Sequence, residues 1–384
     1  MHILFIPAWY SIDKEDNQTG SFFLEQAQAL RDCGHDIGIF YCNKISIKKI
    51  IEVISLKIKG RSRYGIYIED NINFTLLPIL IISKKFFLYR RIYKYFFSIY
   101  LKFYIKKYGE PDIIHFHSMW GMNEIPSFIR MKYNFPVVIT EHCSAYVSDK
   151  IENEQLKFGK KNIKNSSAFF AVSDYYSAYL NNLFNVNTIR VMPNNISKQV
   201  EKIDNIKKSD VFTFICVGNL VEIKNQKLAI ISFEKFLKIN ENSKLKIIGD
   251  GPNLKDLIEL VAKLGINNNV VFMGRLDRAR TLHEISTSHV LLVTSKIETF
   301  SVVTIEALAL MTLVITTSCG GPEMLVNSLN GIVCKNKDLY HDHMLYIYNN
   351  YESYNLNQIR EQCLINYSGK NISALLIKEY SKLL

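Results

Sequence analysis

Paired cysteines and long apolar runs are both missing from this sequence of 384 residues. The seven cysteines are scattered and odd in number, and none has C-x-x-C spacing, which excludes a disulfide framework and a zinc ribbon. The longest apolar run, residues 74–82, is interrupted twice and is too short to span a bilayer. The apolar start MHILFIPAW has no basic segment before it, so we expect a buried strand there rather than a secretory signal. These absences favour a protein of the reducing cytoplasm.

Arginine is also scarce, because it supplies only 11 of the 47 basic residues although the formal net charge is +11. A positive excess can indicate nucleic acid or anionic lipid as a partner, or only a drift of the coding sequence toward lysine. Proteins that read bases depend on arginine, whose forked guanidinium matches guanine and phosphate. We therefore expect no nucleic-acid partner.

The length and composition predict two domains with full cores, since 48% of the residues are hydrophobic and 22% are charged. Short β-branched runs alternate with helical stretches, which predicts an α/β fold with parallel sheets covered by helices. The first series of strands is expected at residues 2–7, 35–41, 113–117, 136–140 and 169–173, the last ending where Ser173 caps a helix. A second series of five strands begins near residue 211. The segment 192–210 has linker character, and we place the domain boundary between residues 195 and 196.

Two glutamates follow one of the strands of the second series. In LLVTSKIETFSVVTIEALAL a strand reaches Ser295, Glu298 lies in the loop, and Glu306 lies in a helix that starts near Val302. Ligands bind at the carboxyl ends of strands in such sheets, and the free N–H groups of a helix start suit a phosphate. The carboxylates could then accept hydrogen bonds from hydroxyls on either side of that phosphate. By spacing alone the pattern is weak, and two surface glutamates are the simpler interpretation.

The surrounding motifs decide between these interpretations. The segment resembles the E-x7-E signature of family 4 of the retaining glycosyltransferases. VGNLVEIKNQKLAI is similar to the G-R-L-x-x-x-K-G opening of that family's second domain, and IIGDGPN, VVFMG and CGGPEML follow its order. In the first half, GSFFLEQAQALRDCGHDI, PDIIHFHSMWG, VVITEHCSAY and RVMPNNI also match in order and spacing. The resemblance runs nearly from end to end.

This resemblance implies the GT-B fold, in which two Rossmann-like β/α/β domains face each other across a cleft. Residues 1–195 would bind the acceptor and residues 196–369 the nucleotide sugar, and a helix at 370–384 would pack back on the first domain. Glu306 would hold the ribose hydroxyls and Glu298 a hydroxyl of the donor sugar, and Lys224 would neutralise the diphosphate. The implied catalytic residues are His142 and Glu298, and the implied donor-binding residues are Gly20, Asn219, Lys224, Gly249, Gly274, Phe300, Ser301, Val302 and Glu306.

The chain departs from the family pattern at several of these positions. Asn219 stands where the family usually has the arginine of G-R-L, which removes a cation from the expected diphosphate site. Ser301 replaces the glycine after E-x-F, and serine tolerates such a turn less freely. His115 and His117 follow a buried strand, where packing or local hydrogen bonds are the simpler interpretation. The departures bear on donor affinity and leave the expected fold unchanged.

A D-x-D pair for a metal-bound diphosphate is missing as well. Asp250 is followed by Gly251 and Pro252, and Asp277 has only basic neighbours. Charge on the leaving diphosphate would then be met by Lys224, backbone amides and a helix N-terminus, so we expect neither metal nor cofactor. The co-substrate is expected to be a UDP-sugar. The resemblance implies same-face transfer with retention, with His142 stabilising the transition state.

A basic aromatic segment at residues 84–109 has eight lysines and arginines and no acid. It predicts either a core helix with a solvated basic face or an interfacial helix on anionic lipid. The second interpretation adds an anionic membrane surface as a partner and places the protein on the inner face of the membrane, near a lipid-linked glycan.

The expected function is transfer of a sugar to a growing surface glycan, such as a polysaccharide, a lipopolysaccharide or a lipid-linked oligosaccharide. Two alternatives stay open. A nucleotide-sugar epimerase would share the double Rossmann architecture, and a non-catalytic binding subunit would be consistent with Asn219.

Overall fold

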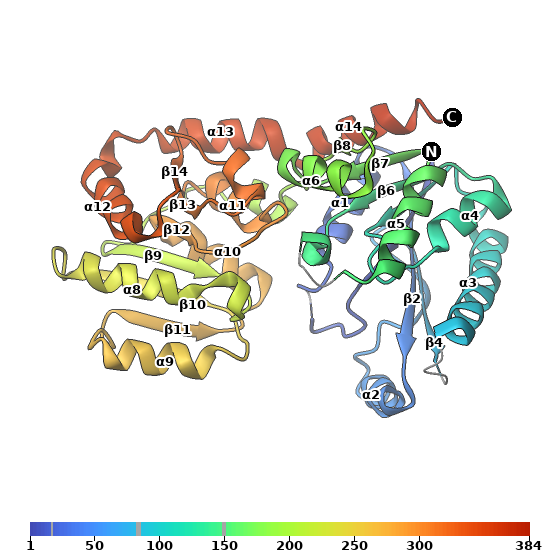
Figure 1. The fold of residues 1–384 in the computed structure, drawn as a ribbon, viewed down its shortest axis with the longest axis horizontal. Helices are drawn as coiled ribbons and strands as arrows, with labels where there is room; N and C mark the ends of the chain where they lie inside the picture. Colours follow the sequence, from blue (N-terminus) through green and yellow to red (C-terminus); the bar gives the residue numbers. More distant parts are fainter. Residues whose placement is uncertain (17, 82–85, 148–150) are drawn as a thin grey trace. The chain divides into compact units, whose positions relative to one another are not determined.

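The computed structural model describes residues 1–384 except residue 17, residues 82–85 and residues 148–150. The chain forms two compact units. The first contains residues 1–171, 177–192 and 372–384, and the second contains residues 172–176 and 193–371 (Figure 1). The main boundary between the two units therefore lies between residues 192 and 193. The sequence analysis placed it between residues 195 and 196. The assignment of residues 172–176 to the second unit was not anticipated.

The first unit is built on an eight-stranded sheet with the order β3-β4-β2-β1-β5-β6-β7-β8, parallel except for β3. Its strands are β1 (His2–Pro7), β2 (Asp36–Ile45), β3 (Gly65–Glu69), β4 (Ile72–Leu80), β5 (Ile113–His117), β6 (Val137–Glu141), β7 (Ala168–Ala171) and β8 (Arg190–Val191). Strands β1, β5, β6 and β7 are almost wholly buried, which is why they read as continuous apolar runs in the sequence.

Helices connect these strands. They are α1 (Ser21–Asp32), α2 (Ile47–Ile58), α3 (Phe86–Tyr108), α4 (Ile125–Tyr133), the short η1 (Ser144–Val147), α5 (Asn153–Asn165), α6 (Asp174–Phe184) and the C-terminal α14 (Gly369–Tyr380). Ile372, Leu376 and Tyr380 of α14 are fully buried in the core of the first unit. Their spacing of four residues aligns them on one face of α14, so the end of the chain completes the core of the unit in which the chain began.

The second unit has a fully parallel six-stranded sheet with the order β11-β10-β9-β12-β13-β14. The strands are β9 (Phe212–Val217), β10 (Ser243–Ile248), β11 (Val270–Gly274), β12 (Val290–Val293), β13 (Leu313–Thr317) and β14 (Gly331–Cys334). The helices are α7 (Lys198–Glu201), η2 (Glu222–Lys224), α8 (Gln226–Leu237), α9 (Leu254–Lys263), α10 (Arg278–Thr287), α11 (Val302–Ala309), η3 (Gly321–Met324), η4 (Lys337–Leu339), α12 (Tyr340–Asn350), η5 (Tyr351–Ser353) and α13 (Leu356–Tyr367). The α/β fold with two largely parallel sheets is confirmed.

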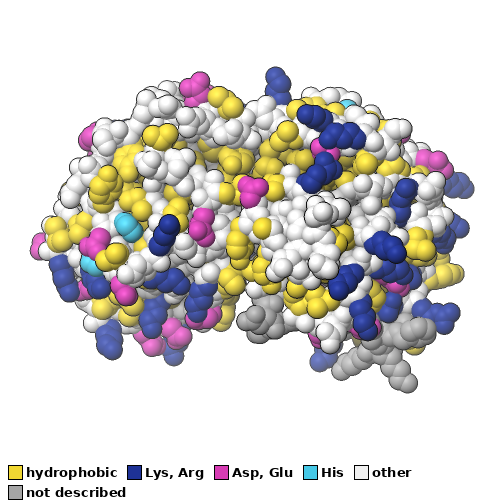
Figure 2. Space-filling view, turned by 45° about the horizontal axis from the view of Figure 1, so that its top comes forward, with side chains coloured by type: hydrophobic (Ala, Val, Ile, Leu, Met, Phe, Trp, Pro, Cys, Tyr) yellow, Lys and Arg dark blue, Asp and Glu magenta, His cyan; other side chains and the backbone are white. Residues whose placement is uncertain are grey.

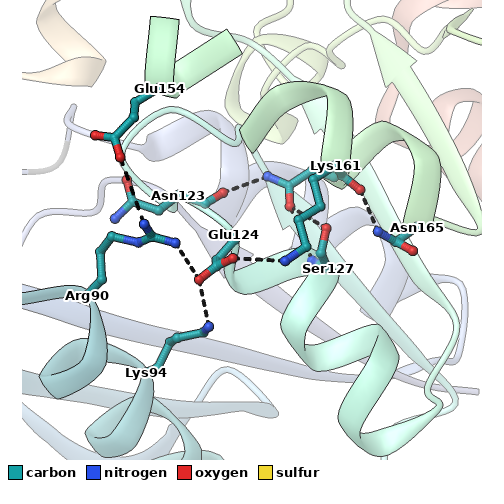
Figure 3. Close-up of polar contacts among 9 residues, drawn as sticks. Arg90, Lys94, Asn123, Glu124, Ser127, Glu154, Lys161 and Asn165 are labelled. Atoms are coloured by element: carbon teal, nitrogen blue, oxygen red, sulfur yellow. Dashed lines mark hydrogen bonds and ion pairs between the residues drawn. The ribbon is translucent and has the colours of Figure 1, made fainter. Parts of the chain in front are cut away.

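One carboxylate connects three helices of the first unit. Glu124, just before α4, accepts hydrogen bonds from Arg90 Nη2 (2.6 Å) and Lys94 Nζ (2.6 Å) of α3 and from Lys161 Nζ (2.9 Å) of α5 (Figure 3). Partial burial alone would raise the pKa of Glu124, but the hydrogen bonds from Lys94, Lys161 and Arg90 lower it to about 2. Arg90 also lies 3.9 Å from Glu154. Two cations of the basic aromatic segment therefore serve the packing of α3.

Charges of both signs are mixed on one face of the molecule. On the face shown in Figure 2, lysine and arginine side chains are scattered, with acidic side chains among them. A single continuous basic surface, as nucleic-acid binding requires, is not seen on that face. Of the helices in the described ranges, none combines the length and apolar content needed to cross a bilayer.

Candidate active site

Glu298 lies in the loop after β12 and contacts a cation directly. Its Oε1 accepts hydrogen bonds from Lys224 Nζ (2.5 Å) and from Ser295 Oγ (2.6 Å). The loop is held in place by its backbone, since the N–H of Glu298 donates to the carbonyl of Cys319 (2.7 Å) and its own carbonyl accepts from the N–H of Gly321 (2.9 Å). The E-T-F loop and the C-G-G turn, recognised separately in the sequence, thus form one structure.

Lys224 reaches Glu298 from η2, which follows β9. Its backbone carbonyl accepts a hydrogen bond from Thr294 Oγ1 (3.0 Å), which ties η2 to the end of β12. Lys224, Glu298 and Val303 of the first turn of α11 line one small pocket of the second unit. The structure therefore brings together the residue expected to meet the diphosphate, the residue expected to meet the donor sugar, and the helix start expected to meet a phosphate.

The start of α11 has an unusual backbone. Ser301, its N-cap, has φ of 78° and ψ of 83°, a region that residues with a Cβ rarely adopt. Its Oγ lies 2.8 Å from Thr304 Oγ1. Phe300 is buried and its ring packs edge-on against Tyr367. Ser301 thus adopts a left-handed backbone conformation that glycine adopts more easily. Val302 follows it and begins the helix beside the pocket.

Glu306 has a partner that the sequence analysis missed. It is 2% exposed, and its Oε1 forms an ion pair with Arg278 at the first position of α10. The sequence contained a signal, because the basic neighbours of Asp277 were noted only as an argument against a metal site. A buried carboxylate needs a partner of opposite charge, so Arg278 holds Glu306 in place.

Glycines shape the carboxyl edge of this sheet. A Cβ at Gly249 would lie 1.9 Å from the carbonyl oxygen of Gly218, so only glycine fits between the ends of β9 and β10. Gly274 has φ of 66°, and a Cβ there would have no described heavy atom within 4 Å, so its backbone conformation, rather than space, favours glycine. Asn219 is exposed, and its carbonyl accepts a hydrogen bond from Gln226 Nε2 (3.1 Å).

In the first unit, His142 follows β6 and is buried among aromatic rings. Its Nε2 lies 3.2 Å from Nδ1 of His117, and its ring contacts those of Phe22 and Phe23 of α1. Gly20, immediately before α1, has φ of 78°, and a Cβ there would lie 3.1 Å from the carbonyl oxygen of Trp9. The glycine allows α1 to start close to the β1 loop, which brings its phenylalanines onto His142.

His142 is the end of a row of three histidines. His115 Nδ1 lies 2.6 Å from the hydroxyl of Tyr380 and its Nε2 lies 2.8 Å from Thr140 Oγ1, so its ring serves packing, with partners that are distant along the chain rather than local. His117 lies between His115 and His142, with its ring 4.2 Å and 5.4 Å from theirs. Burial lowers the pKa of His115 and of His117 well below the usual histidine value. His117 is therefore a neutral neighbour that fixes the orientation of His142.

Glu141 is a second residue that the sequence analysis overlooked. Its buried carboxylate accepts hydrogen bonds from Ser118 Oγ and from the backbone N–H groups of Met119 (2.8 Å), His142 (2.9 Å) and Cys143 (2.8 Å). Burial raises the pKa of Glu141 to about 7, against the effect of these four hydrogen bonds. The glutamate of T-E-H thus holds the turn that carries His142.

Two family models match this chain. The model of Glycosyltransferase Family 4 matches residues 19–199, and the model of Glycosyl transferases group 1 matches residues 197–361. The chain belongs to the family 4 glycosyltransferases. The two matches meet near residue 198 and together include every candidate site residue.

Curated relatives match over part of their length. N-acetyl-alpha-D-glucosaminyl L-malate synthase of Bacillus anthracis is 30% identical over 138 residues, which are 36% of this chain and 35% of that protein. A glycosyltransferase of Methanocaldococcus jannaschii is 37% identical over 123 residues, which are 32% of this chain and 30% of that protein. The chain thus spans about a third of the length of these relatives.

Solved structures match over the whole chain. Sucrose-phosphate synthase from Thermosynechococcus elongatus has a TM-score of 0.77 at 18% identity, covering 100% of this chain and 98% of that chain. HepE from Anabaena, in complex with UDP, has a TM-score of 0.73 at 14% identity and covers 100% of both chains. At such identities the likeness shows the fold, which is GT-B.

Proposed function

We propose that this family 4 glycosyltransferase moves a sugar, with retention, from a UDP-sugar to a growing surface glycan such as a polysaccharide, a lipopolysaccharide or a lipid-linked oligosaccharide. The ion pair between Lys224 and Glu298, in one pocket with the start of α11, carries the proposal. Lys224 supplies a cation and the start of α11 supplies backbone amides for a diphosphate, and Glu298 supplies a carboxylate for sugar hydroxyls. The UDP bound in the HepE structure supports the choice of nucleotide.

The contacts of the pair suggest how the donor is received. Lys224 is held by Glu298 through one oxygen, and Ser295 donates to that same oxygen. When a diphosphate enters, Lys224 exchanges the carboxylate for the more highly charged phosphate. Glu298 is then available to accept a hydrogen bond from a hydroxyl of the donor sugar. Glu306, held in place by Arg278, binds the ribose hydroxyls.

In the proposed reaction, the acceptor oxygen forms a bond to the anomeric carbon on the face from which the diphosphate leaves. The bond between that carbon and the phosphate oxygen breaks, and the acceptor proton passes to the leaving phosphate. Lys224 and the amides of α11 stabilise the charge that develops on the diphosphate, and no step requires a metal ion. His142, oriented by His117 and by the Glu141 turn, stabilises the transition state through a hydrogen bond.

Association with an anionic membrane is also part of the proposal, because a lipid-linked acceptor would be met there. The segment first considered for this role forms α3, which buries Tyr93, Phe97, Leu101 and Tyr104 in the core. Its Lys84 and Lys85 lie outside the described residues. Tyr95 and Phe103 are exposed, so α3 retains an outward face that could meet lipid.

The alternative of a non-catalytic binding subunit is supported by one observation. Asn219 is exposed at the carboxyl end of β9, where the family pattern has a cation. Binding and turnover must therefore be measured separately. An epimerase gains no support from the geometry of Lys224 and Glu298.

The first experiment is a thermal-shift screen with UDP, GDP and ADP, followed by sugars of the nucleotide that binds. UDP is expected to raise the melting temperature by stabilising the second unit, since a ligand at about 100 times its Kd contributes about 2.7 kcal/mol. A shift with UDP but no transfer from any UDP-sugar would favour the binding subunit. A shift with none of the nucleotides would contradict the proposed function.

A further inference from the structure

Helix α2 carries a row of isoleucines that faces solvent. Ile47, Ile51, Ile54 and Ile58 are exposed by 60%, 76%, 51% and 80%. At 3.6 residues per turn these four side chains fall within about 60° of one another around the helix axis. None of the residues of α2 is buried, and Val53 and Leu56 on the other side are half-buried. Contiguous apolar side chains in water mark a binding surface, because covering them is favourable.

Lysines accompany this isoleucine row: at 3.6 residues per turn Lys48 and Lys57 lie on either side of it, whereas Lys49 lies on the opposite side of the helix. Lys48, Lys49 and Lys57 lie on α2 and Lys59 follows it directly, whereas Glu52 is the single acid of the helix. In the part of the chain that the structure describes, none of these four lysines has an ion-pair partner, whereas the nearby Arg61 pairs with Asp13 and Glu15. The cations beside the isoleucine row are therefore available to an external anionic partner.

The helix is carried on an extension of the sheet. The pairing of β2 with β1 ends at Ile39, but its pairing with β4 continues to Ile45. The last six residues of β2 extend about 20 Å at the usual rise of a strand. Figure 1 shows α2 at the tip of β2, at the lower end of the first unit. The isoleucine row is thus presented on a convex, projecting element rather than in a groove.

We infer that α2 binds an anionic membrane surface, with the isoleucine row inserted at the boundary between head groups and acyl chains. A single convex helix with a narrow apolar row and flanking lysines has the composition of helices that lie in this interface. Its lysines would meet the lipid phosphates. A second copy of the chain is a poorer occupant, since its α2 would bring like charges together around the isoleucines.

This inference assigns the proposed membrane association to a particular helix. It rests on the proposed function only for the statement that a glycosyltransferase is the protein held at the membrane. Strands β2 and β6 run parallel in one sheet, so α2, after β2, and His142, after β6, follow strand ends at the same sheet edge. Attachment through α2 would turn the carboxyl edge of the first unit's sheet toward the lipid. A lipid-linked acceptor would then be presented to the edge that carries His142.

The test is flotation of the full chain with vesicles of phosphatidylglycerol and phosphatidylcholine in equal amounts, and with vesicles of phosphatidylcholine alone. Wild type should float with the anionic vesicles, and Ile51→Ser with Ile54→Ser should weaken this binding by about tenfold for each isoleucine. The matched control is Ile239→Ser with Ile365→Ser, two isoleucines of the second unit that are 65% and 58% exposed. This control should bind as wild type does. Lys48 and Lys57 changed to Gln should reduce binding chiefly at low salt.

Several results would overturn the inference. The first is failure of wild type to float with anionic vesicles. The second is flotation of the Ile51→Ser, Ile54→Ser double variant at the wild-type level. The third is a dimer of wild type in gel filtration that the double variant abolishes and the control variant does not. Loss of flotation on changing Lys102, Lys106 and Lys107 to Gln, with the α2 variant unaffected, would assign the membrane to α3 instead. No donor is needed for flotation, and the α2 variant should keep the UDP-induced thermal shift. A failure of the lipid inference is thereby distinguishable from a failure of the proposed function.

Discussion

Glu298 and Glu306 belong to one sequence signature, yet each carboxylate has its own cation. Glu298 contacts Lys224 from η2, and Glu306 contacts Arg278 from α10. Glu298 also keeps a hydrogen bond from Ser295, and Glu306 is almost fully buried. The first carboxylate can exchange partners when a donor binds, whereas the second is fixed in place before binding. Different consequences are therefore expected when each charge is removed.

Changing Glu306 to Gln should weaken UDP binding, because a neutral acceptor forms weaker hydrogen bonds with the ribose. Changing Glu298 to Gln should leave UDP binding nearly intact and lower turnover. Each loss is expected at about 1.5–3 kcal/mol, roughly ten- to a hundredfold. Calorimetry with UDP and donor turnover separate the two effects.

The matched control for these variants is Glu284→Gln. Glu284 pairs with Lys246 at 2.7 Å in the same unit, and neither residue was placed in the site. It should bind UDP and turn over donor as wild type does. If Glu298→Gln and Glu306→Gln both turned over donor at the wild-type rate, the assigned site would be wrong.

The residues that the sequence analysis missed share a physical reason. Arg278 and Glu141 each contact a segment that lies elsewhere in the chain: Arg278 contacts Glu306, and Glu141 contacts Ser118 and Met119. Motif glycines and the spacing of two glutamates can be recognised within a short stretch of sequence, because they depend on the local backbone conformation and on the start of one helix. A side-chain pair between α10 and α11 depends on how two helices pack, which no local pattern contains.

At the scale of elements, buried parallel strands were the easiest to predict. Residues 113–117 form β5 as expected, and Ser173 caps α6 by accepting a hydrogen bond from the N–H of Tyr176 (3.1 Å). Strand β14 was missed because GIVC is short and half of it is only partly buried. Its first residue is Gly331. Its role in the structure is steric, since a Cβ there would lie 1.9 Å from the carbonyl oxygen of Val314 on β13.

Helices α3, α4 and α5 offer a test of packing through charge. Glu124→Gln removes the carboxylate and leaves Arg90, Lys94 and Lys161 close together without it. Water screens this partly exposed cluster, so the loss of stability is expected at about 1–2 kcal/mol, or a few degrees in Tm. Glu154→Gln is the control, because Glu154 is exposed and 3.9 Å from Arg90, and it should change Tm little.

The pH dependence of this effect has a defined sign. The folded-state pKa of Glu124 is about 2, below its ordinary value of 4.5. Its contribution to stability is thus fully present above pH 4.5 and is lost as the pH falls toward 2. The difference in Tm between wild type and Glu124→Gln should shrink over this range, as thermal unfolding followed by circular dichroism can show. A constant difference down to pH 2 would contradict the role given to the carboxylate.

At the scale of the whole molecule, the chain forms two units, each built on one sheet. Each unit also includes a short segment from elsewhere in the chain, residues 372–384 in the first and residues 172–176 in the second. The sequence predicted two α/β domains because apolar strand runs restart near residue 211. It did not predict that residues 172–176 belong to the second unit. There the hydroxyl of Ser173 donates to the carbonyl of Thr299 (2.6 Å), and a Cβ at Gly320 would lie 2.5 Å from the ring of Tyr175. Such contacts join distant segments and follow from the fold alone.

The central claim is that Lys224, beside Glu298 and the start of α11, meets the charge of the leaving diphosphate without a metal ion. The most direct test is the rate of UDP release from the donor sugar in EDTA, for wild type, Lys224→Ala and the control Lys246→Ala. Wild type and the control should keep their rates in EDTA, and Lys224→Ala should lose about 2–4 kcal/mol of transition-state stabilisation, roughly 30- to 1000-fold. Full dependence of wild type on added Mg²⁺ or Mn²⁺, or an unchanged rate in Lys224→Ala, would contradict it.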